Sequence, residues 1–285
     1  MQRLSPYLIA ARPHQWLKNL LVFAAPLAAG EIDNGNTLFR TSSAAFLFLL
    51  VSVSVYFFND LCDIEADKQH NQKAQRPIAN GKVSVRSLVG VILVFSITSL
   101  TLGFLLSSGL GICLGVYTFV NFLYSVKVKE LPYIELVLVA SGFVLRAAAG
   151  GMPTNIPLSF WFITLVSSTS FFLVAGKRFA ELSTYQTHMS RLVLKFYSLK
   201  ILETLMALSS SLAVITYGFW LGQSANTQTS YSLVSLFLFT SALLRYRLRL
   251  QTGFGEDPVR TVLNDFWLLV LSVLWALTYG VAIYG

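Results

Sequence analysis

The chain has 285 residues, of which 55% are hydrophobic and only 12% are charged. Soluble globular domains contain about 45–50% apolar and about 25% charged residues, so this composition excludes an ordinary soluble domain. The apolar residues come in long blocks and the two cysteines, Cys62 and Cys113, provide no disulfide framework. We therefore expect one all-α, multi-pass membrane domain over residues 1–285.

A transmembrane helix needs about 17–25 mainly apolar residues. In chain order, the sequence predicts nine such helices, at residues 16–30, 42–59, 86–107, 110–126, 133–152, 157–176, 203–222, 231–248 and 265–284. The first segment is the weakest of them, because it is short and contains Lys18 and Pro26.

The basic residues predict the orientation of these helices. Of the 21 Lys and Arg residues, 19 lie at the N-terminus or around the loops after the second, fourth, sixth and eighth segments. The other two are Arg40 and Arg146. Such an asymmetry indicates that this face is cytoplasmic. The net charge of +8 is therefore mostly a topology signal, and no nucleic-acid partner is expected.

Carboxylates gather at the end of the second segment, in VYFFNDLCDIEADK (55–68), which holds four of the 13 acidic residues. If the helix continues through this stretch, Asp60, Asp63 and Asp67 share one face, Asn59 lies at its edge and Glu65 points away. Oxygen ligands of this kind suit Mg²⁺, which typically takes one or two carboxylates plus substrate phosphates. The alternative is a set of solvated residues at the membrane boundary, but clustering in so acid-poor a chain favours function.

Basic residues follow in the same loop, KQHNQKAQRPIANGK (68–82). Lys68, His70, Lys73 and Arg76 would surround the carboxylates with positive charge. Metal on one side and Lys and Arg donors on the other suit a phosphate or diphosphate. The alternative is that these residues only follow the positive-inside rule.

Two further loops of the same predicted face repeat this mixture. One contains Tyr124 and Lys129 in LYSVKVK, and the other contains Lys177, Arg178 and Glu181 in AGKRFAEL. Because Glu181 follows Lys177 by four residues, the two side chains can pair across one helical turn instead of binding a ligand. Both interpretations stay open from the sequence.

Arg146, in SGFVLRAAAGG (141–151), lies within the predicted span 133–152, toward the side away from the predicted cytoplasmic face. It either extends to the lipid headgroups or faces the interior of the bundle as a functional group. The sequence does not separate these alternatives.

These motifs resemble those of the UbiA-type intramembrane prenyltransferase superfamily. NDLCDIEAD matches its NDxxDxxxD pattern at Asn59, Asp60, Asp63 and Asp67, and RPIANG (76–81) resembles a segment that follows it. The resemblance implies nine helices around a central cavity that opens sideways to lipid, with cytoplasmic cap loops. It also implies that Mg²⁺, held by Asp60, Asp63 and Asp67 with help from Asn59, binds a diphosphate.

One departure from the superfamily points to a particular branch. Members that transfer a prenyl group carry a second Asp-rich motif where this chain has AGKRFAEL, which contains no aspartate. AGKRFAEL, RPHQWLKN (12–19), LYSVKVK and SGFVLRAAAGG are similar to the decaprenyl-phosphate phosphoribosyltransferase branch. That resemblance implies transfer of 5-phosphoribosyl from phosphoribosyl diphosphate to a polyprenyl phosphate in a bacterial plasma membrane, toward arabinose donors for the cell wall.

The same resemblance implies roles for individual residues. Lys177 and Arg178 join the three aspartates as catalytic groups that contact phosphate. The expected substrate-binding residues are Asn59, Lys18, Lys73, Arg76, Tyr124, Lys129, Arg146 and Glu181.

Two alternative functions remain. A prenyltransferase of the same fold would consume a prenyl diphosphate and act on an aromatic or isoprenoid acceptor. A cation-coupled transporter would more naturally place its carboxylates near the bilayer midplane, whereas these lie at the predicted cytoplasmic edge. The oligomeric state does not follow from the sequence.

Overall fold

The structure is a computed structural model that describes residues 5–69, 73–184, 192–223, 229–252 and 257–284. Within these ranges every regular element is helical and no strand occurs, which confirms the predicted all-α class. The chain divides into two compact units. Unit 1 comprises residues 1–129 and 145–156, and unit 2 comprises residues 130–144 and 157–285.

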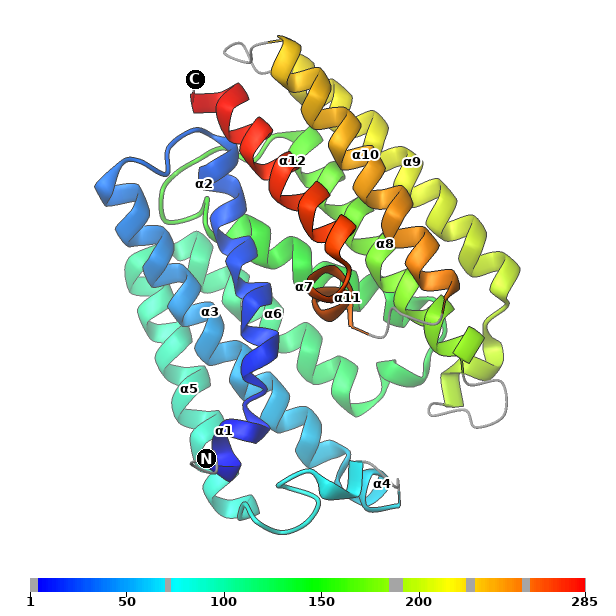
Figure 1. Cartoon of the computed structure of the whole chain (residues 1–285). Helices are drawn as coiled ribbons and strands as arrows, with labels where there is room; N and C mark the ends of the chain where they lie inside the picture. Colours follow the sequence, from blue (N-terminus) through cyan, green and yellow to red (C-terminus); the bar gives the residue numbers. More distant parts are fainter. Residues whose placement is uncertain (1–4, 70–72, 185–191, 224–228, 253–256, 285) are drawn as a thin grey trace. The chain divides into compact units, whose positions relative to one another are not determined.

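Unit 1 is built around three long helices that pack side by side in Figure 1, α3, α5 and α6. Its elements are α1 (Pro6–Ala10), η1 (Pro13–Phe23), α2 (Ala24–Ala28), α3 (Gly35–Cys62), α4 (Ile64–Lys68), η2 (Lys73–Gln75), α5 (Val85–Leu106) and α6 (Ser108–Val126). The short helix η3 (Val128–Glu130) and helix α7 (Ile134–Ala149) each have residues in both units.

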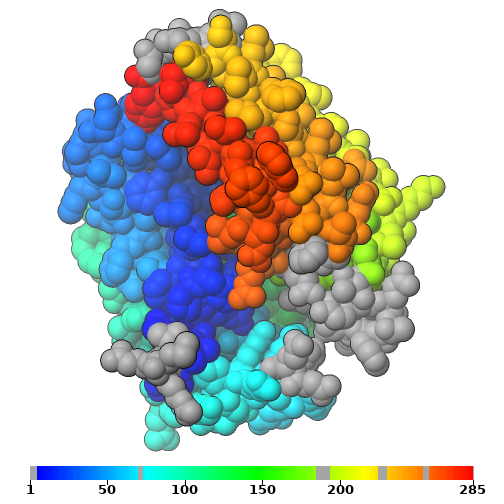
Figure 2. All heavy atoms as spheres, in the orientation of Figure 1, coloured from blue at the N-terminus to red at the C-terminus, as the bar shows by residue number. Residues whose placement is uncertain are grey.

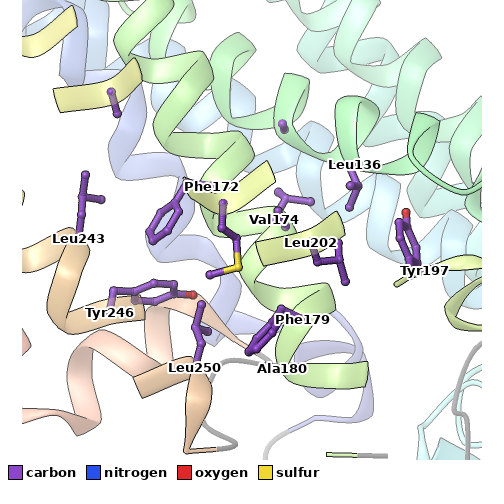
Figure 3. Packing of buried hydrophobic residues seen from close by; sticks show 14 of the residues in the cluster. Leu136, Phe172, Val174, Phe179, Ala180, Tyr197, Leu202, Leu243, Tyr246 and Leu250 are labelled. Atoms are coloured by element: carbon purple, nitrogen blue, oxygen red, sulfur yellow. The ribbon is translucent and has the colours of Figure 1, made fainter. Parts of the chain in front are cut away.

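Unit 2 contains the remaining helices. They are α8 (Phe160–Thr184), η4 (Leu192–Phe196), α9 (Leu199–Gln223), α10 (Thr229–Gln251), α11 (Pro258–Asn264) and α12 (Phe266–Tyr284). Helix α8 packs along α9, and α10 packs along α12. Figure 3 shows the core of this unit, where Phe172 of α8, Leu202 of α9 and Tyr246 of α10 come together.

Six helices in the described part of the chain are long and apolar enough to cross a membrane: α3, α5, α6, α8, α9 and α12. Helix α7 has only 16 residues, and α10 ends in a segment rich in arginine.

Large apolar side chains remain exposed on the long helices, such as Trp267 at 61% and Phe237 at 69%. Figure 2 shows the outer surface of α12, in red, beside α10, in orange. Such apolar faces suit contact with lipid. The backbone of a helix also suits lipid, because its polar groups are hydrogen-bonded within the helix.

The first predicted span, 16–30, is not one helix. The chain instead forms the 3-10 helix η1 and the short helix α2. Arg12 precedes η1 in the left-handed region with φ 53°, and Pro13 occupies its first turn. Pro13 is tolerated at the start of η1, but Pro26 has no N–H to donate to the preceding turn, so regular helical bonding is interrupted where η1 passes into α2.

Helix α3 begins earlier than predicted, at Gly35 instead of residue 42. The Asn34 side chain accepts hydrogen bonds from the backbone N–H groups of Asn36 at 3.0 Å and Thr37 at 3.3 Å. An Asn cap of this kind satisfies N–H groups that the first turn leaves unpaired. Polar residues such as Thr37 therefore belong to the helix, although they lie outside the apolar block.

Close packing in unit 1 depends on Gly150, which follows α7. A Cβ atom there would lie 1.8 Å from the carbonyl oxygen of Val22 in η1. Only glycine allows the two backbone segments to approach this closely. The contact fixes η1, and with it the segment that carries Arg12 and Lys18.

Candidate active site

Helix α3 ends within the Asp-rich motif, so the continuous helix assumed from the sequence is interrupted. Asp63 follows α3 with φ −98° and ψ 3°, and α4 begins at the next residue. The backbone N–H of Asp63 still donates to Asn59 O at 3.0 Å, and that of Asp67 donates to Asp63 O at 2.8 Å. Because i to i+4 bonding persists across the interruption, Asp60 and Asp67 remain on the same side.

The three aspartates are paired with three basic side chains of unit 1. Arg12 donates to Asp60, and Lys129 donates to Asp63. Arg76 Nη1 lies 2.6 Å from Asp67 Oδ2 and 3.3 Å from Asp60 Oδ1, so one nitrogen bridges two carboxylates. We call the set of Arg12, Asp60, Asp63, Asp67, Arg76 and Lys129 the acidic cluster; its three carboxylates and three cations balance in formal charge.

Neutral side chains extend the acidic cluster on the α3 side. The Asn59 amide donates to Asp63 Oδ2 at 3.1 Å, and its oxygen accepts from Ser125 Oγ of α6 at 3.3 Å. Glu65, by contrast, is exposed and pairs with Lys68 at 2.8 Å. The prediction that Glu65 points away from the other carboxylates is therefore confirmed, and Lys68 is drawn to Glu65.

A divalent cation fits part of this arrangement. In the described ranges no group of three or more His, Cys, Asp or Glu side chains is arranged to hold a metal ion. However, Asp60 and Asp67 lie close enough to share one cationic nitrogen. Mg²⁺ needs only one or two carboxylates when phosphate oxygens and water complete its shell. The donor set thus suits a metal bound together with a diphosphate, with Asp63 on the Lys129 side.

Arg12 is a site residue that the sequence analysis missed. It lies 48 residues from its partner Asp60, and its guanidinium lies 5.5 Å from the centre of the Tyr56 ring. Arg12 itself has the left-handed backbone conformation, and η1 begins at the next residue, Pro13. The available signal was the position of Arg12 at the start of RPHQWLKN, on the same predicted face as the Asp-rich motif.

The AGKRFAEL motif of α8 forms a buried ion network in unit 2. Arg178 Nε and Nη2 donate to the two oxygens of Glu135 at 2.5 and 2.6 Å, and Nη1 donates to Glu181 at 2.5 Å. Lys177 lies 3.9 Å from Glu181, so the pairing across one turn is present. We call Glu135, Lys177, Arg178, Glu181 and Tyr197 the glutamate network. Arg178 is only 2% exposed, which speaks against the predicted direct contact between Arg178 and a phosphate.

Tyr197 completes the glutamate network beside the core shown in Figure 3. Its hydroxyl donates to Glu135 Oε1 at 3.2 Å and accepts from the backbone N–H of Tyr133 at 2.9 Å. Burial, together with the Glu135 carboxylate, raises the pKa of Tyr197. The hydroxyl therefore stays protonated and acts as a donor. Glu135 and Tyr197 were not predicted, because a single Glu at the start of an apolar segment has the pattern of a boundary residue.

Arg146 faces the interior of unit 1, so the headgroup alternative is wrong. It is 5% exposed. Its Nε donates to Asn19 at 2.9 Å, and its Nη2 donates to Ser52 at 3.2 Å and to the Tyr117 hydroxyl at 2.6 Å. The guanidinium also lies 4.8 Å from the centre of the Tyr117 ring. Arg146 thus ties η1, α3 and α6 to the end of α7.

Three predicted substrate-binding residues lie on elements that flank the acidic cluster in the sequence. Lys18 is on η1, Lys73 is on η2 and Tyr124 is on α6, one residue before Ser125. All three are half-buried. Their contacts with substrate stay predictions.

Comparisons with known proteins agree with one another on the family. The model of the UbiA prenyltransferase family matches residues 20–271. The decaprenyl-phosphate phosphoribosyltransferase of Mycobacterium tuberculosis is 37% identical over 96% of this chain and 93% of its own length. The enzyme of that name from Mycolicibacterium smegmatis is 36% identical over 96% of this chain and 91% of its own.

Solved structures give the same fold. A UbiA homologue from Archaeoglobus fulgidus, bound to DMAPP and Mg²⁺, superimposes with a TM-score of 0.74 at 18% identity, covering 98% of this chain and 99% of that one. At that identity the likeness concerns the fold alone. With the family model, the relatives and the Asp-rich motif in agreement, the chain belongs to the UbiA prenyltransferase family.

Proposed function

We propose that this protein transfers the 5-phosphoribosyl group of phosphoribosyl diphosphate to a polyprenyl phosphate, with decaprenyl phosphate as the expected acceptor, and releases diphosphate. Relatives that bear this activity in their names are similar over nearly the whole chain. The reaction replaces the bond between the anomeric carbon and the diphosphate with a bond to the lipid phosphate.

One observation carries the choice between the two transferase reactions. A prenyltransferase of the superfamily is expected to have a second Asp-rich motif, whereas AGKRFAEL places Arg178 between Glu135 and Glu181. These charges are already paired inside unit 2 and form no second set of metal ligands. Phosphoribosyl diphosphate, unlike a prenyl diphosphate, also carries a 5-phosphate, and Lys177 remains the candidate contact for a further phosphate of this kind.

The residues of the acidic cluster supply binding and charge stabilisation. Asp60 and Asp67 would hold Mg²⁺, which neutralises charge on the leaving diphosphate when it is bound. Arg12, Arg76 and Lys129 can donate charge-assisted hydrogen bonds to phosphate oxygens. The lipid phosphate is already ionised at neutral pH and needs no strong general base. Catalysis then depends on positioning and on stabilisation of the leaving group.

The proposed setting is a bacterial plasma membrane. We place the acidic cluster at the cytoplasmic face, because nearly all Lys and Arg residues flank that side of the predicted spans. We retain one domain of nine spans with a central cavity open to lipid and cytoplasmic cap loops as part of the proposal. The A. fulgidus homologue bound to DMAPP and Mg²⁺ supports Mg²⁺ as the metal.

The test uses the full chain purified in detergent with Mg²⁺, radiolabelled phosphoribosyl diphosphate and decaprenyl phosphate. We expect label in the organic phase, and none when a chelator or the Asp60→Asn variant is used. Glu65→Gln is the matched control, since Glu65 is exposed and outside the acidic cluster. If no label is transferred but a prenyl diphosphate is consumed with an aromatic acceptor, the protein is a prenyltransferase instead.

A further inference from the structure

The acidic cluster suggests how the proposed metal and diphosphate sites depend on each other. We propose that Arg12 and Arg76 are exchangeable counter-ions, which pair with Asp60 and Asp67 until a diphosphate binds and then pair with the diphosphate. As a consequence, the divalent metal and the diphosphate bind cooperatively. This inference rests on the diphosphate site of the proposed function. It adds that the protein binds a divalent cation only weakly when no diphosphate is present.

Charge balance is the first argument. The acidic cluster contains three carboxylates and three cations, each carboxylate in contact with at least one cation. A divalent cation added alone would bring excess positive charge next to Arg12 and Arg76. A diphosphate offers these cations new anionic partners, so its arrival removes the repulsion that opposes the metal.

The position of Arg76 is the second argument. Its Nη1 lies 2.6 Å from Asp67 and 3.3 Å from Asp60, where a cation shared by the two carboxylates has to lie. Arg76 and a metal ion held by both carboxylates therefore compete for one place. Since a guanidinium also pairs well with phosphate oxygens, Arg76 has an alternative partner when it leaves.

The exposure of the side chains is the third argument. The carboxylates of Asp60 and Asp67 are buried, with side chains 4% and 6% exposed, whereas Arg12 and Arg76 are 26% and 31% exposed. The arginines thus have room to reorient, while the carboxylates stay in place on α3 and α4. The pairs that hold them are partly solvated, so breaking them costs less than breaking a fully buried pair.

The consequence is a measurable coupling. Bound diphosphate is expected to raise the affinity for the divalent cation by at least about tenfold, and by linkage the cation raises the affinity for diphosphate by the same factor. Removing the positive charge of Arg76 should remove part of the competition. The Arg76→Gln variant should therefore bind a divalent cation alone at least about tenfold more tightly than the wild type.

The experiment measures Mn²⁺ binding without any substrate. Free Mn²⁺ is followed by electron paramagnetic resonance during titration of the full chain in detergent, for wild type, Arg76→Gln and Arg12→Gln. Arg76→Lys keeps the charge and should resemble wild type. Lys82→Gln is the matched control, because it removes one positive charge from the same loop at an exposed residue outside the acidic cluster.

A second measurement keeps the test independent of variant folding. Calorimetric titration of wild type with inorganic diphosphate is compared in Mg²⁺ and in chelator, and at least about tenfold tighter binding in Mg²⁺ is expected. Equal affinity in both conditions would overturn the proposal. So would micromolar Mn²⁺ binding by wild type alone, or an Arg76→Gln variant that folds but binds Mn²⁺ no more tightly than wild type does.

The failures of the two proposals remain distinguishable. Absence of diphosphate binding under every condition would overturn both this inference and the metal and diphosphate assignment. Coupled binding of metal and diphosphate without phosphoribosyl transfer would overturn the proposed function and leave this inference standing.

Discussion

The acidic cluster of unit 1 and the glutamate network of unit 2 contain similar residues in different environments. In the acidic cluster, the buried carboxylates of Asp60 and Asp67 and the half-buried carboxylate of Asp63 meet cations that are 23–31% exposed. In the glutamate network, the side chain of Arg178 is 3% exposed and forms a bidentate pair with the side chain of Glu135, which is fully buried. The first set suits exchange of partners with a ligand. The second suits structural support, because removing one member leaves a charge that water does not reach.

The comparison also separates two adjacent residues of one motif. Lys177 is 33% exposed and lies 3.9 Å from Glu181, whereas Arg178 is enclosed. Two consecutive helix residues point about 100° apart, so only one of them faces the interior of the unit. A basic pair in the sequence therefore does not imply two phosphate ligands.

The largest expected effect on stability tests the structural role of the glutamate network. Arg178→Met leaves Glu135 and Glu181 without their main cation, which we expect to lower the free energy of unfolding by about 3–5 kcal/mol. That corresponds to a fall in Tm of roughly 6–20 °C, measured by thermal aggregation in detergent. Lys177→Met is the matched control and should change stability by less than about 1 kcal/mol. Equal Tm values for the two variants would contradict the comparison.

A substitution in the acidic cluster should instead lower activity and leave the protein folded. Asp67→Asn keeps the size of the side chain but weakens the proposed metal and diphosphate contacts, so phosphoribosyl transfer should fall by at least about 10²-fold. The variant should still elute as a folded protein at the wild-type position in gel filtration. A variant with wild-type turnover would remove Asp67 from the site.

An intermediate effect is expected for Tyr197. Tyr197→Phe removes the hydrogen bond to Glu135 and leaves the Tyr133 N–H without that acceptor. We expect a loss of about 1–3 kcal/mol, because a buried polar group loses its partner while the packing of the ring is kept. The measurement is the Tm of Tyr197→Phe beside that of Tyr7→Phe, whose hydroxyl bonds Ser87 at an exposed position. Similar shifts in both variants would mean that burial of the hydroxyl does not matter.

Much of the fold follows from apolar runs, because a helix in lipid is apolar over most of its surface. The run at 86–107 thus predicts α5 almost to the residue. The segment at 16–30 differs, because its composition resembles one span but the chain forms η1 and α2, with Pro26 unable to donate a backbone hydrogen bond to the preceding turn. The composition of a segment does not show where regular helical bonding is interrupted within it.

The site was predictable in its acidic part and less so in its basic part. Asp60 and Asp67 are close in sequence, so helical spacing places them together. The pairs of Arg12 with Asp60 and of Arg178 with Glu135 join residues 48 and 43 positions apart. Only the packing of separate helices brings such residues together, and a single sequence does not record it.

The smallest expected effect concerns a third ion cluster, in the turn just before α12. Asp265 accepts hydrogen bonds from Arg245 Nη2 at 2.8 Å and from the backbone N–H of Leu268 at 2.8 Å, and Arg249 Nε lies 2.9 Å away. These contacts, the hydrogen bond from Arg245 foremost, hold the pKa of Asp265 below its usual 3.8. The unfolded chain therefore binds this proton more readily than the folded protein does. The contribution to stability is complete above pH 3.8 and is lost as the pH falls through the lower folded pKa.

Measuring Tm between pH 5 and pH 3 tests this third cluster. Wild type should lose more stability over that interval than Asp265→Asn, because the variant has no carboxylate to titrate at this position. Asp33→Asn, at an exposed acidic residue, should retain the full dependence. The difference between wild type and Asp265→Asn should remain smaller than the effect of Arg178→Met, since Arg245 is 35% exposed and water screens the pair. Parallel curves for wild type and Asp265→Asn would show that partial exposure of the arginines cancels the contribution of this carboxylate.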